Sequence, residues 1–340
     1  MKKFNDIEHF IFLSRNANIY GFKVLKSLIN MKKKPSLVIL PIIQKKLDLK
    51  KKYINRYFHQ KKNNFEPIEY LAKKNSIMVK RVKSINSNKT YNFLKKINTE
   101  LTFICGGWPE LLKKKIFNIP KFLTINIHPS YLPSFRGGDV HRWQILYPRK
   151  KTGITIHAVN KSFDHGRVII KKSINLNMNC PIKLNLHLSN LAARLIPELL
   201  EKKVKSNYAN KQSIKKKQKY YPKWDWKDKN FFFVPEYKYN ILEKFVNASK
   251  NYPNIFNGPF IKIGKKEIIV RKCKTKIFDG KKLFNENFKA TSKYIILKTN
   301  IKNRLCYINE IQLLNNYDWY KNKITTKSIK KNFNKLLYEK

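Results

Sequence analysis

The stretch HFIFLSRNANIYGFKVLKSLINMKKKPSLVIL, residues 9–40, decides the fold class of this chain. Its first part, His9–Ser14, is apolar enough for a buried strand, and Ser36–Leu40 is a second run of the same kind. Between them, Tyr20–Asn30 carries apolar residues near helical spacing. Strand, helix and strand in this order predict the first unit of a parallel sheet. The turn between strand and helix, Arg15–Gly21, lacks the Gly-x-Gly-x-x-Gly pattern, which disfavours a dinucleotide site there.

The same alternation continues along the first half of the chain. Helices are expected over 67–75, 90–98, 110–117 and 181–200, and strands over 78–83, 101–105, 122–127, 153–159 and 167–174. This order predicts an α/β fold, a Rossmann-like doubly wound, mostly parallel sheet. Ligands are expected at the carboxyl ends of its strands.

The pattern of apolar and polar residues changes after a basic segment, Lys202–Lys219. Short strand-like runs with turns follow, together with one expected helix over Lys238–Ser249. We therefore predict a catalytic domain over 1–205, a basic linker over 206–222 and a smaller β-rich, barrel-like domain over 223–340.

The chain is strongly basic, with 74 Lys and Arg against 21 Asp and Glu and a formal net charge of +53. One interpretation is a nucleic-acid partner, contacted through the basic insert Gln44–Asn64. The other is compositional, because Lys, Asn and Ile dominate everywhere in the chain. The charge alone leaves both open.

Neither a transmembrane run nor a signal sequence stands out, and we expect a cytoplasmic protein without a membrane partner. The four cysteines, at positions 105, 180, 273 and 306, are widely spaced and form no Cys/His cluster. No metal site is expected from them.

Polar residues gather where the expected strand 122–127 ends. Asn126 and His128 lie two apart and share one face of a strand, and Asp164 follows a later strand. Acyl transfer to an amine needs a donor for the oxyanion and a group that moves a proton. An amide can be that donor, an imidazole can move the proton, and a carboxylate can orient the imidazole. Each residue alone would more often be structural.

The surrounding pattern is long and ordered: NIHPSYLPSFRGG at 126–138, TGITIH at 152–157 and FDHGRVI at 163–169. In these motifs the chain resembles the 10-formyltetrahydrofolate-dependent formyltransferase family, which includes glycinamide ribonucleotide, methionyl-tRNA and sugar N-formyltransferases. The resemblance covers residues 8–205 well. It extends weakly over 218–310, where it implies an OB-like barrel.

The resemblance implies a role for particular residues. It makes Asn126, His128 and Asp164 the catalytic trio, and 10-formyltetrahydrofolate the formyl donor, with no metal. The residues implied to bind this donor are Gly107, Trp108, Leu112, Asn160 and Phe163. The residues expected near the acceptor are Arg136, Gly137, Asp139 and Trp143.

Two acceptors compete. The basic insert, the linker and the net charge favour methionyl-tRNA. The segment Gly138–Trp143 replaces the Ala-Ala-Pro typical of the tRNA enzymes and looks more like the enzymes of nucleotide-linked amino sugars. We weigh residues near the site above bulk charge and favour an amino sugar or another small amine.

Other readings also remain. A non-catalytic RNA-binding relative and a hydrolase of the formyl donor are both compatible with the sequence, although an intact trio argues against the first. The sequence assigns no role to His141, His157 or His165, and no oligomeric state.

Overall fold

A computed structural model describes residues 2–42, 65–204, 219–224, 233–249, 258–263, 266–278, 288–291, 294–301, 303–313 and 323–325. The basic insert predicted at 44–64 lies outside these residues, and so do residues 206–218 of the predicted linker. The chain divides into two compact units. The first comprises Met1–Gln144, Arg149–Asn177 and Ile182–Lys223, and the second comprises Ile145–Pro148, Met178–Pro181 and Trp224–Lys340.

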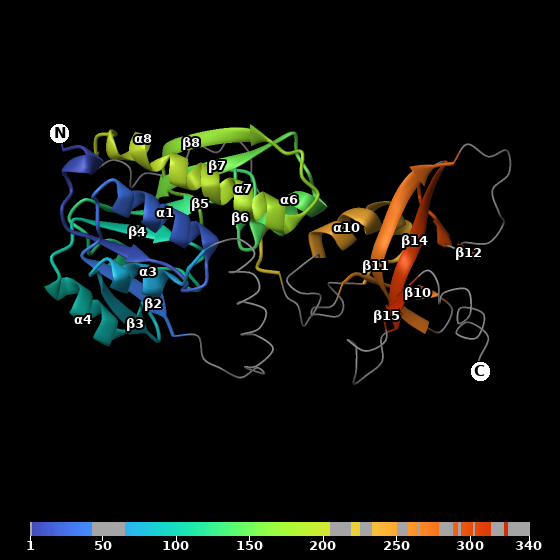
Figure 1. Ribbon diagram of the computed structural model, residues 1–340, viewed down its shortest axis with the longest axis horizontal. Coiled ribbons are helices and arrows are strands. Elements are labelled where there is room, and N and C mark those ends of the chain that lie inside the picture. The colour runs from blue at the N-terminus through green and yellow to red at the C-terminus, as the bar shows by residue number, and fades with distance from the viewer. Residues whose placement is uncertain are drawn as a thin grey trace. The chain divides into compact units, whose positions relative to one another are not determined.

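The first unit is built on a seven-stranded sheet of order β3-β2-β1-β4-β5-β7-β8 (Figure 1). The strands β3, β2, β1, β4 and β5 are parallel to one another. Strand β7 is antiparallel to β5, and β8 is antiparallel to β7. The strands span Phe10–Leu13 (β1), Leu37–Pro41 (β2), Met78–Val82 (β3), Leu101–Cys105 (β4), Leu123–His128 (β5), Lys151–Ala158 (β7) and Val168–Asn175 (β8). The predicted Rossmann-like, mostly parallel α/β sheet is confirmed.

Helices connect these strands. They span Ile19–Asn30 (α1), Ile68–Lys74 (α3), Asn88–Lys96 (α4), Lys114–Phe117 (α5), Val140–Leu146 (α6), Pro181–Arg194 (α7) and Ile196–Leu200 (α8), with a 3-10 turn at Phe4–Asp6 (η1). Asn18 caps α1, because its side-chain oxygen accepts the backbone N–H groups of Tyr20 and Gly21 at 2.9 and 3.1 Å. This cap explains why α1 begins directly after the turn that follows β1.

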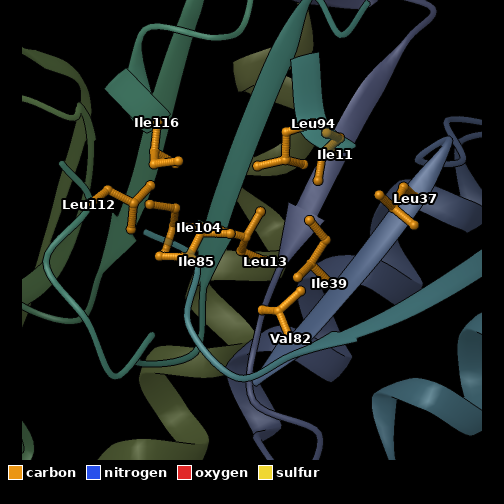
Figure 2. Close-up of a cluster of buried hydrophobic side chains, with 10 residues drawn as sticks. All are labelled: Ile11, Leu13, Leu37, Ile39, Val82, Ile85, Leu94, Ile104, Leu112 and Ile116. Carbon is orange, nitrogen blue, oxygen red and sulfur yellow. The ribbon is translucent and has the colours of Figure 1, made fainter. Parts of the chain in front are cut away.

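An apolar cluster forms the core on one side of this sheet (Figure 2). It joins side chains of β1, β2, β3 and β4 to Leu94 of α4 and Ile116 of α5. Its members are Ile11, Leu13, Leu37, Ile39, Val82, Ile85, Leu94, Ile104, Leu112 and Ile116. The cluster fixes α4 and α5 against the sheet, because apolar surface removed from water favours this packing.

Local structure departs from the predictions at two helices. The single helix predicted over 181–200 is two helices, α7 and α8, which meet at Leu195. Pro197 lies in the first turn of α8 and has no N–H to continue α7, which accounts for the break. The helix predicted over 110–117 is shorter, since α5 begins only at Lys114.

The second unit contains an antiparallel sheet of order β10-β11-β14-β13-β12, with β15 paired to β14. Its elements are Glu236–Ile241 (η3), Leu242–Ser249 (α10), Phe260–Ile263 (β10), Lys266–Ile277 (β11), Phe288–Ala290 (β12), Ile295–Lys298 (β13), Arg304–Leu313 (β14) and Lys323–Thr325 (β15). Helix α10 packs on β11, where the Glu243 carboxylate accepts the backbone N–H of Thr275 at 2.7 Å. The predicted β-rich character is confirmed, and closure as an OB-like barrel stays a prediction.

Among the helices that the structure describes, none has the length and apolar character needed to cross a membrane.

Candidate active site

Strands β5 and β7 bring polar side chains to one face of the sheet. In their antiparallel register Asn126 lies opposite His157, and His128 lies opposite Thr155. Residues opposite each other share a face, as do residues two apart on one strand. The register therefore places Asn126, His128, Thr155 and His157 together, at the carboxyl end of β5.

One carboxylate joins these groups. Asp164 Oδ1 lies 3.2 Å from Asn126 Nδ2, 3.5 Å from His128 Nδ1 and 3.4 Å from His157 Nε2. His157 is 2%, His128 5% and Asp164 8% exposed. The structure thus brings Asn126 and His128 of the predicted trio into contact with Asp164 and adds His157. We call Asn126, His128, His157 and Asp164 the polar cluster.

The loop after β7 is shaped to present Asp164. This residue has a left-handed backbone with φ of 55°, which Asp tolerates better than most side chains. Gly166 allows the loop to turn back, because a Cβ there would lie 1.5 Å from the carbonyl oxygen of Ala158. The backbone N–H of Gly137 donates to Asp164 Oδ2 at 2.9 Å and fixes the second carboxylate oxygen.

The motif that follows β5 positions His128. The ring nitrogen Nε2 lies 2.9 Å from the carbonyl oxygen of Phe135. That carbonyl is held by a compact loop: Ser130 Oγ donates to the carbonyl of Ser134 at 2.7 Å, and Thr155 Oγ1 donates to the carbonyl of Ser130 at 2.7 Å. The Ser and Thr of the motif therefore serve the loop, which in turn orients the imidazole.

Burial and neighbouring groups set the charges of the cluster. Burial alone would raise the pKa of Asp164, but His128, His157 and the N–H of Gly137 outweigh it and hold this pKa well below its usual range. Burial lowers the pKa of His128, against the opposing influence of Asp164 and the Phe135 carbonyl. At neutral pH the site therefore contains an ionised carboxylate beside a neutral His128.

The residues expected to bind the donor lie near one another only in part. Trp108 and Val159, which precedes Asn160, both pack against the apolar cluster, to which Leu112 belongs. The indole Nε1 of Trp108 is buried without a hydrogen-bond partner among the described residues, and a Cβ on Gly107 would meet no atom within 4 Å. The roles of Gly107 and Trp108 toward a donor stay predictions.

Three of these residues have contacts of their own within the protein. Leu112 is 4% exposed and contributes to the core. Phe163 is 43% exposed, with its ring centroid 5.9 Å from that of Tyr220, and Asn160 Oδ1 accepts the N–H of Ser162 at 3.0 Å. Their roles toward a donor stay predictions.

The residues expected near the acceptor divide into two groups. Arg136–Gly137 (β6) pairs with Tyr220–Tyr221 (β9) and adjoins Asp164. Asp139 lies in a turn where its carbonyl accepts the N–H of Arg142 at 2.9 Å. Trp143 is 7% exposed, and its indole donates to the carbonyl of Pro222 at 2.8 Å. This contact gives Trp143 a structural role in holding the 219–224 segment.

Sequence reasoning missed His157 and Tyr220 as neighbours of the site. The alternation Thr155-Ile156-His157 was the available signal for the first, since it puts both polar residues on one face of β7. His141, also left open, has a pKa lowered to about 4 by burial and the nearby Arg142. It is neutral at neutral pH and lacks the charge that would bind a phosphate.

Within the described part of the chain, no group of three or more His, Cys, Asp or Glu side chains is arranged so that it could hold a metal ion.

Comparison with known proteins agrees with the resemblance seen in the sequence motifs. Residues 44–198 match the family described as Formyl transferase. A methionyl-tRNA formyltransferase of Caldanaerobacter subterraneus subsp. tengcongensis is 31% identical over 143 residues, which are 42% of this chain and 46% of the relative. A methionyl-tRNA formyltransferase of Caldicellulosiruptor saccharolyticus is 30% identical over 210 residues, 59% of this chain and 65% of the relative. The matches thus span less than two thirds of these relatives.

A solved structure agrees with the fold. The N-formyltransferase of Helicobacter canadensis, in complex with folinic acid and dTDP-3-aminofucose, has a TM-score of 0.55 at 17% identity and covers 89% of this chain and 98% of its own. At this identity the likeness concerns the fold. Together with the match of residues 44–198 and the motifs at 126–169, it supports the resemblance of this chain to the formyltransferase family.

Proposed function

We propose that the protein transfers a formyl group from 10-formyltetrahydrofolate to a primary amine. The observation that carries this proposal is the convergence of Asn126, His128 and His157 on Asp164 Oδ1, within 3.2 to 3.5 Å. An amide donor, a neutral imidazole and an ionised carboxylate are the groups that acyl transfer to an amine requires.

The chemistry runs in two steps. The amine nitrogen bonds to the formyl carbon, whose oxygen becomes an oxyanion, and the C–N10 bond then breaks as N10 takes a proton. Asn126 donates to the oxyanion. Its bond to Asp164, at 3.2 Å, is longer than the usual ~2.9 Å, so the substrate oxygen can replace that contact.

His128 moves the proton from the amine to N10. Nε2 is bound to the Phe135 carbonyl at 2.9 Å, so Nδ1 is the nitrogen that receives the proton. The imidazolium then has both N–H groups satisfied, one by Phe135 and the other by Asp164. This pairing lowers the cost of holding a cation in a buried site.

The acceptor we favour is methionyl-tRNA. Two relatives that are 30–31% identical carry that name, and the net charge of +53 suits a nucleic acid. The buried position of Trp143 also weakens the local argument for a sugar. A nucleotide-linked amino sugar is the second candidate, because the segment Gly138–Trp143 departs from the Ala-Ala-Pro of the tRNA enzymes.

The test is formation of tetrahydrofolate from 10-formyltetrahydrofolate by the purified full chain, with methionyl-tRNA or a dTDP-linked amino sugar as acceptor. We expect His128→Ala to abolish transfer. The matched control is His9→Ala, because His9 is exposed and precedes β1, at the opposite end of the parallel strands. Transfer that survives in His128→Ala would refute the proposal, and formate release without acceptor would indicate hydrolysis instead.

A further inference from the structure

His157 is a buried residue of β7 with partners on both ring nitrogens. Nδ1 lies 2.8 Å from the carbonyl oxygen of Ala158. Nε2 lies 3.2 Å from Asn126 Nδ2 and 3.4 Å from Asp164 Oδ1. The steps proposed above give this ring no task, although it contacts two members of the trio.

The orientation of the Asn126 amide follows from its neighbours. Asp164 is ionised, so its oxygen can only accept, and an amide oxygen 3.2 Å away would be repelled. The amide nitrogen must therefore face Asp164. The same nitrogen faces His157 Nε2 at 3.2 Å, so Nε2 must accept for that contact to be a hydrogen bond.

Three protonation states of His157 can be compared on these distances. With the proton on Nδ1, the ring donates to Ala158 at 2.8 Å and accepts from Asn126 at 3.2 Å, while the Nε2 lone pair faces Asp164 Oδ1 at 3.4 Å. With the proton on Nε2, two acceptors face each other at 2.8 Å and two donors at 3.2 Å. The imidazolium gains a bond to Asp164 at 3.4 Å but loses the one to Asn126. The first state satisfies the two shortest contacts.

We propose that His157 is a positioning residue: neutral, with its proton on Nδ1, it holds the Asn126 amide so that the N–H side faces the reacting oxygen. This inference rests on the formyl transfer proposed above. The amide oxygen and nitrogen are nearly equal in size, and a 180° rotation would present an acceptor to the oxyanion. His157 and Asp164 both oppose that rotation, because each is an acceptor for the amide nitrogen.

The charged and titratable groups around His157 come from three elements. Asp164 lies on the loop after β7, and His128 on β5 is at 6.4 Å between ring centroids. Arg136 on β6 acts on Asp164 electrostatically. In this arrangement the carboxylate has a cation nearby other than His157.

Kinetics of two variants test the role. In His157→Leu the acceptor is lost, and we expect kcat to fall about 10- to 100-fold with KM nearly unchanged, as for a misplaced catalytic group. In His157→Gln, a side-chain oxygen can accept from Asn126, and we expect most of kcat to return. In the Asn126→Ala background, His157→Leu should cost nothing further, because His157 acts through that amide.

A spectroscopic measurement tests the same inference without activity. Two-dimensional ¹⁵N–¹H spectra of histidine side chains, with His157 assigned by its absence in His157→Gln, report which ring nitrogen carries the proton. We expect Nδ1 protonated and Nε2 unprotonated at pH 7.5. The opposite tautomer or an imidazolium would overturn the inference.

The two proposals can fail separately. If the wild-type chain transfers no formyl group to any amine, the proposed function is wrong. The measured tautomer of His157 would still show whether its Nε2 accepts a hydrogen bond from Asn126. An active wild type whose His157→Leu variant keeps its kcat defeats the positioning role alone. If His157→Leu does not fold, the kinetics of His157→Gln and the measured tautomer of His157 in the wild type still test the positioning role.

Discussion

The polar cluster around Asp164 and the apolar cluster of Figure 2 are both buried in the first unit, and they are built in opposite ways. The apolar cluster holds ten side chains without a polar atom, drawn from neighbouring strands, from α4 and α5, and from two loops. The polar cluster holds four side chains that satisfy one another through a single carboxylate. Burial of the first stabilises the fold, whereas burial of the second costs desolvation that its hydrogen bonds only offset.

This difference separates stability from chemistry within one unit. Substitutions in the polar cluster should remove activity and leave a folded chain. Substitutions in the apolar cluster should lower the free energy of unfolding and leave the activity of the folded molecules intact. The following changes test how sharp that division is.

The largest effect is expected from Asp164→Asn. The amide is nearly isosteric and tolerates the left-handed backbone at this position, where φ is 55°. It removes the charge that stabilises protonated His128, and we expect kcat/KM to fall about 10³-fold, in the range of lost general acid–base catalysis. Circular dichroism should report a folded chain. A variant that is active, or one that unfolds, would place Asp164 among structural residues.

The complementary change is Leu13→Ala in the apolar cluster. Leu13 is 1% exposed, and removing its side chain should lower the free energy of unfolding by about 2–5 kcal/mol, as measured by urea denaturation. Met78→Ala is the matched control, because Met78 on β3 is 63% exposed. Loss of kcat in the folded Leu13→Ala protein would show that the two clusters are coupled.

The two clusters also differ in how well the sequence predicts them. Apolar runs such as 10–13 and 37–40 predict the core strands. The alternation of these runs with helical patterns is enough to predict the parallel sheet. Asn126, His128 and Asp164 were predicted from a motif with fixed order. His157 was not, because a lone histidine on a buried strand is equally compatible with a core position. Only the register between β5 and β7 puts it opposite Asn126.

Contacts between distant segments were also beyond the sequence. The pairing of β6 with β9 joins Arg136–Gly137 to Tyr220–Tyr221, which lie within the linker predicted over 206–222. Directly after β9, the carbonyl of Pro222 accepts a hydrogen bond from the Trp143 indole. Strands of two residues are too short to show a periodicity, so no local sequence pattern predicts them.

A third prediction concerns this junction, through Gly137→Ala. Gly137 has φ of 115°, and a Cβ would lie 2.0 Å from the carbonyl oxygen of Tyr221. The shift of its backbone should weaken the N–H bond to Asp164 and lower kcat about 10- to 100-fold, as expected for a misplaced catalytic group. Gly258→Ala is the control, since its Cβ would have no neighbour closer than 3.3 Å. Equal rates in the two variants would show that this N–H contributes nothing.

The smallest effect is expected from pH near neutrality and comes from His128. Burial lowers the pKa of this residue below its usual 6.5, so the neutral form that accepts a proton predominates above that value. Since Asp164, whose pKa is held well below its usual range, stays ionised, kcat should be flat from pH 7 to 8.5. It should fall about tenfold per pH unit below the pKa of His128.

The same shift affects folding. The unfolded chain takes up a proton at this histidine at higher pH than the folded chain does. The contribution of His128 to stability is therefore complete above pH 6.5 and declines as the pH falls toward its folded pKa. Urea midpoints measured from pH 5 to 8.5 should begin to decline near pH 6.5, and kcat should decline only at lower pH, below the pKa of folded His128. A kinetic midpoint above pH 7 would mean that Asp164, rather than burial, dominates the pKa of His128. The polar cluster would then stabilise the protonated imidazole by more than desolvation destabilises it.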